Sequence, residues 1–151
     1  MKHLFLTVFI LCSYALPSHS QQHLDFMGVP MGGSIADFTE QVRQRYPLQR
    51  KVGGERYYIY MGPVFGHNTY FKAEYSRKTK TVYKITVTPK SIDQTAYVDS
   101  LMAHYGEPIE VSNGYRWNQL GGTILLYTPQ GYDPVLFYID EEGVAKFKEE
   151  K

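Results

Sequence analysis

Apolar and polar residues alternate most clearly between residues 56 and 88, where turn residues separate three strand-like runs. The runs are rich in Tyr, Phe, Val, Ile and Thr, which favour a pleated, half-buried surface. Gly62-Pro63 and Gly66-His67-Asn68 interrupt the first join, and residues 76–80 form a polar hairpin connection. The pattern predicts a three-stranded antiparallel meander on which the rest of the chain packs.

Apolar residues at helical spacing precede and follow this meander. Ser34 is the expected N-cap of the first helix, with Asp37 in the capping-box position, and Pro47 ends it. Ser91 precedes the second helix and Gly106 follows it. The apolar stripes are Ile35, Phe38 and Val42 in the first helix, and Ile92, Ala96, Leu101, Met102 and Tyr105 in the second.

Three further strand-like runs, at residues 115–119, 123–128 and 135–140, follow the second helix. One helix plus three strands therefore occurs twice, in residues 34–88 and 91–140. We expect an α+β fold, a two-layer sandwich with one antiparallel sheet and two helices on a single face. Residues 24–30 predict a short first strand, and Val144 and Phe147 a short helix in the charged tail.

The first 20 residues have the pattern of a signal peptide rather than of a folded element. An apolar run from Leu4 to Leu16 is followed by Pro17 and by small residues at Ser18 and Ser20. We expect cleavage before Gln21, a single domain of residues 21–151 without a transmembrane segment, and a periplasmic or extracellular location. A lipoprotein anchored at Cys12 and a buried N-terminal helix are the alternatives.

The composition of the remaining chain narrows the class of protein. Loss of Lys2 with the leader leaves 15 basic and 15 acidic residues. Such a balance does not favour a nucleic-acid partner, which usually requires a basic surface. The chain has 14 Tyr and one Trp among 15% aromatic residues, and Tyr combines apolar area with a hydroxyl group that tolerates water.

No sequence motif indicates a reaction, a cofactor or a metal. His23, His67 and His104 are far apart, although zinc needs three or four converging ligands. Nucleophile-elbow, phosphate-loop and dinucleotide motifs are lacking, and Cys12 leaves with the leader. We therefore name no catalytic residue, metal ligand or cofactor, and expect a non-enzymatic protein. A hydrolase with a site assembled from scattered residues is the least favoured alternative.

Strand parity predicts which side chains face away from the helices, because successive side chains point to opposite faces. The expected core sets are Phe71, Ala73 and Tyr75; Tyr83, Ile85 and Val87; Ile124 and Leu126; and Val135, Phe137 and Ile139. The opposite face is then crowded with Tyr and Leu, which is typical of an interaction surface. The predicted binding residues are Tyr58, Tyr60, Tyr70, Arg116, Tyr127 and Tyr138.

Several roles fit such an aromatic face. The first is a binding or inhibitor-like module that contacts a macromolecule, and the second is a binder of a small ligand such as a glycan or lipid. A homodimer could use the same face, and cross-strand Tyr pairs also stabilise sheets that have no partner. A flat, open face favours the first role and a deep aromatic groove the second.

Two resemblances accompany these observations. The opening LDFMGVPMGGSIADF, residues 24–38, resembles a group of uncharacterised small exported proteins of Bacteroidota, which implies export but no chemistry. The repeated helix-plus-meander layout resembles the fold of beta-lactamase inhibitor protein. That second resemblance is of layout only, so it implies an arrangement of elements and carries no function.

Overall fold

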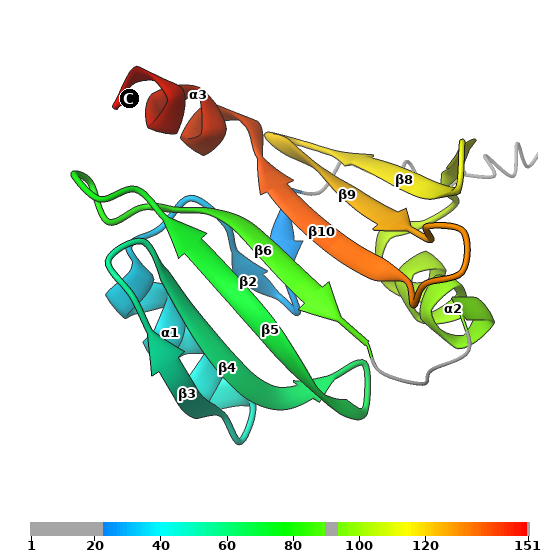
Figure 1. Cartoon of the computed structure of the whole chain (residues 1–151), viewed down its shortest axis with the longest axis horizontal. Helices are drawn as coiled ribbons and strands as arrows, with labels where there is room; N and C mark the ends of the chain where they lie inside the picture. Colours follow the sequence, from blue (N-terminus) through cyan, green and yellow to red (C-terminus); the bar gives the residue numbers. More distant parts are fainter. Residues whose placement is uncertain (1–22, 90–93, 151) are drawn as a thin grey trace, which may run out of the picture.

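Eight strands form one antiparallel sheet in the order β3-β4-β5-β6-β10-β9-β8-β7 (Figure 1). The computed structural model describes residues 23–89 and 94–150. The strands are β3 (Gln49–Gly53), β4 (Tyr57–Val64), β5 (His67–Tyr75), β6 (Val82–Thr88), β7 (Ile109–Val111), β8 (Gly114–Gln119), β9 (Gly122–Tyr127) and β10 (Val135–Asp140). The predicted meander of residues 56–88 corresponds to β4, β5 and β6.

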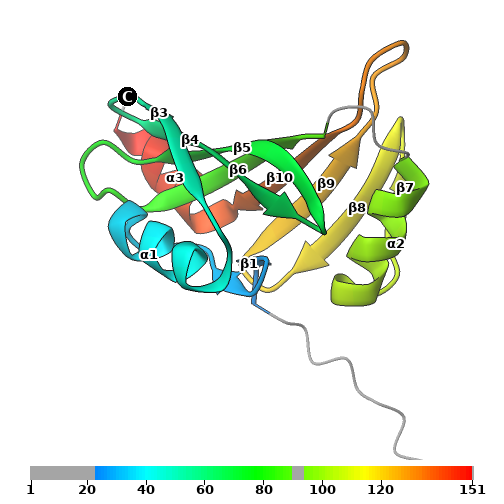
Figure 2. The same cartoon turned by 90° about the horizontal axis from the view of Figure 1, so that it is seen from below.

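Helices α1 (Ile35–Arg45) and α2 (Gln94–Tyr105) lie on the same side of the sheet, as Figure 2 shows. Helix α3 (Glu141–Glu149) follows β10 directly and lies at the end of the sheet (Figure 1). The predicted α+β sandwich, with an antiparallel sheet and two helices on one face, is confirmed. None of the described helices is long and apolar enough to cross a membrane.

The two halves of the sheet have the same arrangement, because the strands of each half follow one another in chain order from the edge to the middle. Helix α1 is followed by four strands and α2 by four strands, and the last strand of each unit, β6 or β10, lies in the middle. Each unit thus contains four strands, one more than the sequence pattern predicted. The strands that were not predicted are the edge strands β3 and β7. Both are short, and their sequences, Gln49–Gly53 and Ile109–Val111, lack an alternation of apolar and polar residues.

The helix ends follow from local hydrogen bonds. The Asp37 amide donates to Ser34 Oγ over 3.1 Å, which confirms the predicted N-cap. The buried residues of α1 are Ile35, Phe38 and Val42, as predicted. In α2 the structure buries Leu101 but leaves Ala96 exposed, because Tyr97 takes the core position.

Residues 24–30 form a hairpin rather than a single strand. Strands β1 (Asp25–Phe26) and β2 (Val29–Pro30) pair across a turn at Met27 and Gly28, both with positive φ. This N-terminal ribbon lies between α1 and α2 (Figure 2). The Phe26 ring contacts Phe38, Phe71 and Tyr138, so the ribbon joins α1 and both halves of the sheet in one core.

Some predictions concern residues that the structure does not describe. The signal peptide of residues 1–20 and its cleavage before Gln21 lie outside the described residues. The same holds for Ser91 and Ile92, which were predicted to begin the second helix. A terminal helix in the charged tail was predicted from Val144 and Phe147, and α3 confirms it.

Candidate binding surface

The face of the sheet opposite α1 and α2, here called the outer face, is built from side chains in register across all the strands. Cross-strand neighbours on one face lie close enough to contact one another. None of the described helices lies over the middle of this face (Figure 1). Its central row runs from edge to edge through Val52, Ile59, Lys72, Thr86, Phe137, Leu125, Arg116 and Ile109.

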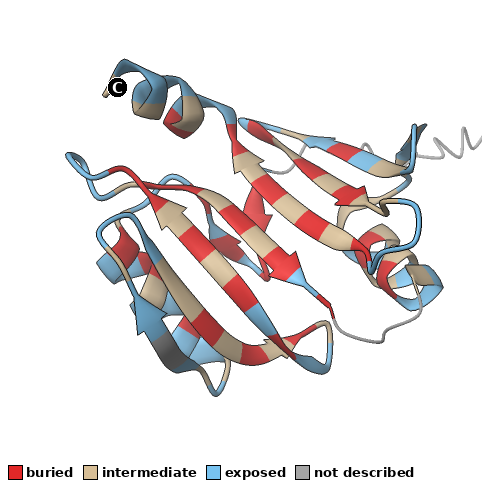
Figure 3. Cartoon of the chain, viewed as in Figure 1, coloured by how far each residue is buried: buried red, intermediate tan, exposed pale blue. Residues whose placement is uncertain are grey.

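Apolar side chains on the outer face remain accessible to solvent. Tyr70 is 43% exposed, Val52 51% and Ile109 48%, whereas the helix-side residues Phe71 and Ile85 are buried. Figure 3 shows the alternation along β5, β6, β9 and β10, where buried positions alternate with half-buried ones. The outer face therefore carries accessible apolar residues from edge to edge, with Lys72 and Thr86 between them at its centre.

Three of the predicted binding residues lie on this surface. Tyr70 pairs with Met61 and Thr88, Arg116 belongs to the central row, and Tyr127 pairs with Val135. Arg116 is exposed and Tyr127 half-buried. The outer face thus brings together Tyr70, Arg116 and Tyr127, whose role in binding stays a prediction.

The other three predicted residues face the helices, so their placement was wrong. Tyr60 and Tyr138 are completely buried. The Tyr60 hydroxyl lies 2.6 Å from Thr39 Oγ1. The Thr39 hydroxyl already donates its hydrogen to the Ile35 carbonyl. The Tyr60 hydroxyl is therefore the donor in its hydrogen bond with Thr39. Tyr58 pairs with buried Ala73 and is half-buried on the same side.

The alternation of residues predicted the wrong face for strands that are apolar on both faces. In β4 the two alternating sets each contain Tyr and aliphatic residues, so hydropathy does not separate them. In β10 the expected core residues Val135, Phe137 and Ile139 are instead half-buried on the outer face. Their faces are set by register, because Tyr138 pairs with Ile85 and Ile124, which are both buried.

A charged group lies beside the centre of the outer face. The Glu74 Oε2 atom is 3.4 Å from Lys72 Nζ and 3.7 Å from Lys84 Nζ. The Lys84 ammonium also lies 5.1 Å from the centre of the Phe137 ring. The alternation along β5 and β6 puts all three side chains on the outer face, but nothing in a single sequence distinguishes them from an ordinary solvated surface.

The buried tyrosines behind the sheet have the electrostatics of a core. Burial raises the pKa of Tyr97 to about 12. Burial likewise raises the pKa values of Tyr105 and Tyr138 well above the ordinary value. Tyr105 donates a hydrogen bond to the Asp25 carbonyl. These phenols therefore stay neutral and hold α2 and the N-terminal ribbon against the sheet.

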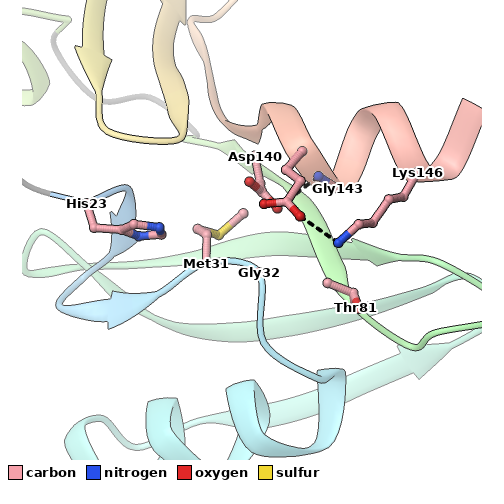
Figure 4. A pocket seen from close by; sticks show the side chains of 8 residues that line it. His23, Met31, Gly32, Thr81, Asp140, Gly143 and Lys146 are labelled. Carbon is pink, nitrogen blue, oxygen red and sulfur yellow. Dashed lines mark hydrogen bonds and ion pairs between the residues drawn. The ribbon is translucent and has the colours of Figure 1, made fainter.

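A polar pocket of about 200 Å³ lies where the N-terminal segment meets the start of α3 (Figure 4). The buried Asp140 carboxylate accepts a hydrogen bond from the Gly143 amide and so caps α3. Burial raises the pKa of this carboxyl group, although the Gly143 bond opposes the shift. Lys146 is paired with Glu142 at 2.6 Å. These interactions cap helix α3 and account for the polar groups that line the pocket.

A second pocket of about 280 Å³ separates α1 from β4. Tyr58 and Tyr60 form one wall, and Thr39, Glu40 and Arg43 of α1 contribute polar groups. Its volume is at the lower limit for small-molecule sites. Among the described residues, no group of three or more His, Cys, Asp or Glu side chains could hold a metal ion.

Comparison with known proteins gives no relative. No family model, curated protein or solved structure matches the chain.

Proposed function

We propose that the protein is a binding module that presents the outer face of its sheet to another protein. The observation that supports this is the central row, in which solvent-accessible side chains, mostly apolar, extend across all eight strands from Val52 to Ile109. Large exposed apolar patches are uncommon on monomeric proteins and mark interaction sites.

The size of the outer face is compatible with this role. Eight strands spaced about 4.8 Å apart make a face roughly 34 Å wide, and six residues along a strand extend about 20 Å. The product is about 700 Å², close to the roughly 800 Å² per partner that a stable protein interface buries. Export directed by residues 1–20 would place this module in the periplasm or outside the cell.

Photo-crosslinking in the producing cells tests the proposal. A photoreactive phenylalanine analogue in place of Tyr70 lies on the outer face, whereas the same analogue in place of Leu120 lies in the turn between β8 and β9. Leu120 is a matched control because it is 54% exposed. We expect a specific protein adduct only from position 70. Equal adducts from both positions, or an adduct only from position 120, would contradict the proposal.

A small-ligand binder is the second candidate, supported by the pocket between α1 and β4. The half-buried Tyr58 presents aromatic surface there, and Arg43 and Glu40 offer polar contacts. A ligand that raises the melting temperature of wild-type protein but not of an Arg43→Gln variant would favour this candidate.

A further inference from the structure

The charge on the outer face indicates what kind of partner the face accepts. The group formed by Lys72, Glu74 and Lys84 has two positive charges and one negative charge. The side chains of Lys72 and Lys84 are 40% and 34% exposed, whereas that of Glu74 is 22% exposed. The Glu74 Oε2 atom is itself buried. The carboxylate oxygen nearest to both ammonium groups is thus covered, and two ammonium groups against one carboxylate give this part of the face a net positive charge.

This positive group is bordered by apolar side chains on both sides. Lys72 is opposite Ile59 in β4, and Lys84 is opposite Ile139 in β10. The Phe137 ring lies against the Lys84 ammonium. An apolar partner that covered this region would remove both lysines from water with only the Glu74 carboxylate to share between them, at a cost in free energy. A carboxylate on the partner removes that cost and forms charge-assisted hydrogen bonds.

Resting on the proposed function, we propose that the outer face accepts a protein segment with an acidic side chain among apolar ones. The carboxylate binds between Lys72 and Lys84. The apolar side chains beside that carboxylate in the partner pack against Phe137 and Leu125 on one side and against Ile59 on the other. These three residues are the apolar members of the central row nearest to the two lysines.

A second copy of this chain fits the same surface less well. A two-fold axis perpendicular to the strands, at the centre of two stacked sheets, places β5 on β5 and β6 on β6, so lysines face lysines. An axis parallel to the strands places β5 on β9 and β6 on β10, so Lys72 and Lys84 face apolar strands. In neither arrangement does the second copy bring a carboxylate opposite Lys72 or Lys84.

Selection of peptides tests this inference without a known partner. A phage-displayed library of random peptides is selected on the immobilised protein, and the enriched peptides are synthesised for titration calorimetry. We expect the peptides to combine Asp or Glu with aromatic or aliphatic residues. Replacing the peptide's acid by its amide, or making Lys72→Gln or Lys84→Gln, should weaken binding about tenfold or more. Lys78→Gln, in the exposed turn after β5, should leave binding unchanged.

The results distinguish failure of the acidic partner alone from failure of the binding face as well. Peptides that lose affinity with Leu125→Ser but not with Lys84→Gln would overturn the acidic partner and retain the binding face. Peptides unaffected by Leu125→Ser, or a selection without binders, would overturn both. Light scattering adds a further outcome, since a dimer that Leu125→Ser dissociates, with Leu120→Ser as control, would identify the occupant as a second copy.

Discussion

At the scale of single residues, burial and hydrogen bonding decide what each tyrosine does. Tyr70 is accessible on the outer face, whereas Tyr60 is buried and bonded to Thr39. Tyr97 is on the buried side of α2, and its hydroxyl finds no hydrogen-bond partner among the described residues. An abundance of Tyr therefore does not define one surface, because the same residue type fills the core and the candidate interface.

The buried hydroxyl of Tyr97 leads to a prediction about alkaline pH. The pKa of Tyr97 is about 12 in the folded protein against an ordinary value of 10.0. The unfolded chain therefore releases this proton first, and the stability contributed by Tyr97 is lost as pH rises from 10 towards 12. Tyr97→Phe should remove this loss and, at pH 7, leave stability unchanged or increase it by up to about 1 kcal/mol.

Urea unfolding of wild type and Tyr97→Phe at pH 7 and pH 10.5 measures both effects. The Phe variant should retain more of its neutral-pH stability at the higher pH. A variant that is clearly less stable than wild type at pH 7 would contradict the prediction, because the hydroxyl would then have a hydrogen-bond partner in the folded protein.

At the scale of secondary-structure elements, the faces assigned to β4 and β5 can be tested by two substitutions of the same kind, Tyr60→Ser in β4 and Tyr70→Ser in β5. Tyr60→Ser removes a buried ring and should destabilise the protein by about 3–5 kcal/mol. Tyr70→Ser on the outer face should change stability by only about 0.5 kcal/mol. Thermal melts of the two variants provide the measurement. Equal melting temperatures would show that the assignment of faces is mistaken.

Helices and turns could be predicted because their signals are local. Ser34 and Asp37 identify the start of α1 without reference to any other element. The faces of β4 and β10 could not be predicted, because their register with neighbouring strands decides which side is buried. The charged group of Lys72, Glu74 and Lys84 needs the pairing of β5 with β6, which hydropathy does not reveal.

At the scale of the whole molecule, the N-terminal ribbon connects the two helix-plus-four-strand units. The Phe26 ring lies 4.9 Å from the Phe71 ring in the first unit and 5.1 Å from the Tyr138 ring in the second. Leu24 donates a backbone hydrogen bond to the Leu120 carbonyl, which further ties the ribbon to the second unit. The ribbon is therefore part of the core although it precedes both units.

Phe26→Ala should destabilise both units together, by about 3–5 kcal/mol, because it leaves a cavity that both of them line. Fluorescence of Trp117, the only Trp, reports on the second unit, and far-UV circular dichroism reports on the whole chain. Both transitions should shift to the same lower temperature, while Leu120→Ala, an exposed control, should leave them unchanged. Two separate transitions in Phe26→Ala would mean that the units fold independently.

The central pairing of β6 with β10 also has a consequence for the order of folding. During synthesis β6 is made well before β10. The edge of β6 that pairs with β10 therefore has no partner until residues 136–139 emerge. An unpaired strand edge can pair with the edge of another chain and start aggregation, and a lysine within the strand is a common natural safeguard. Lys84 occupies that position in β6. We expect the residue that we propose to meet an acidic partner also to protect the incomplete chain from aggregation.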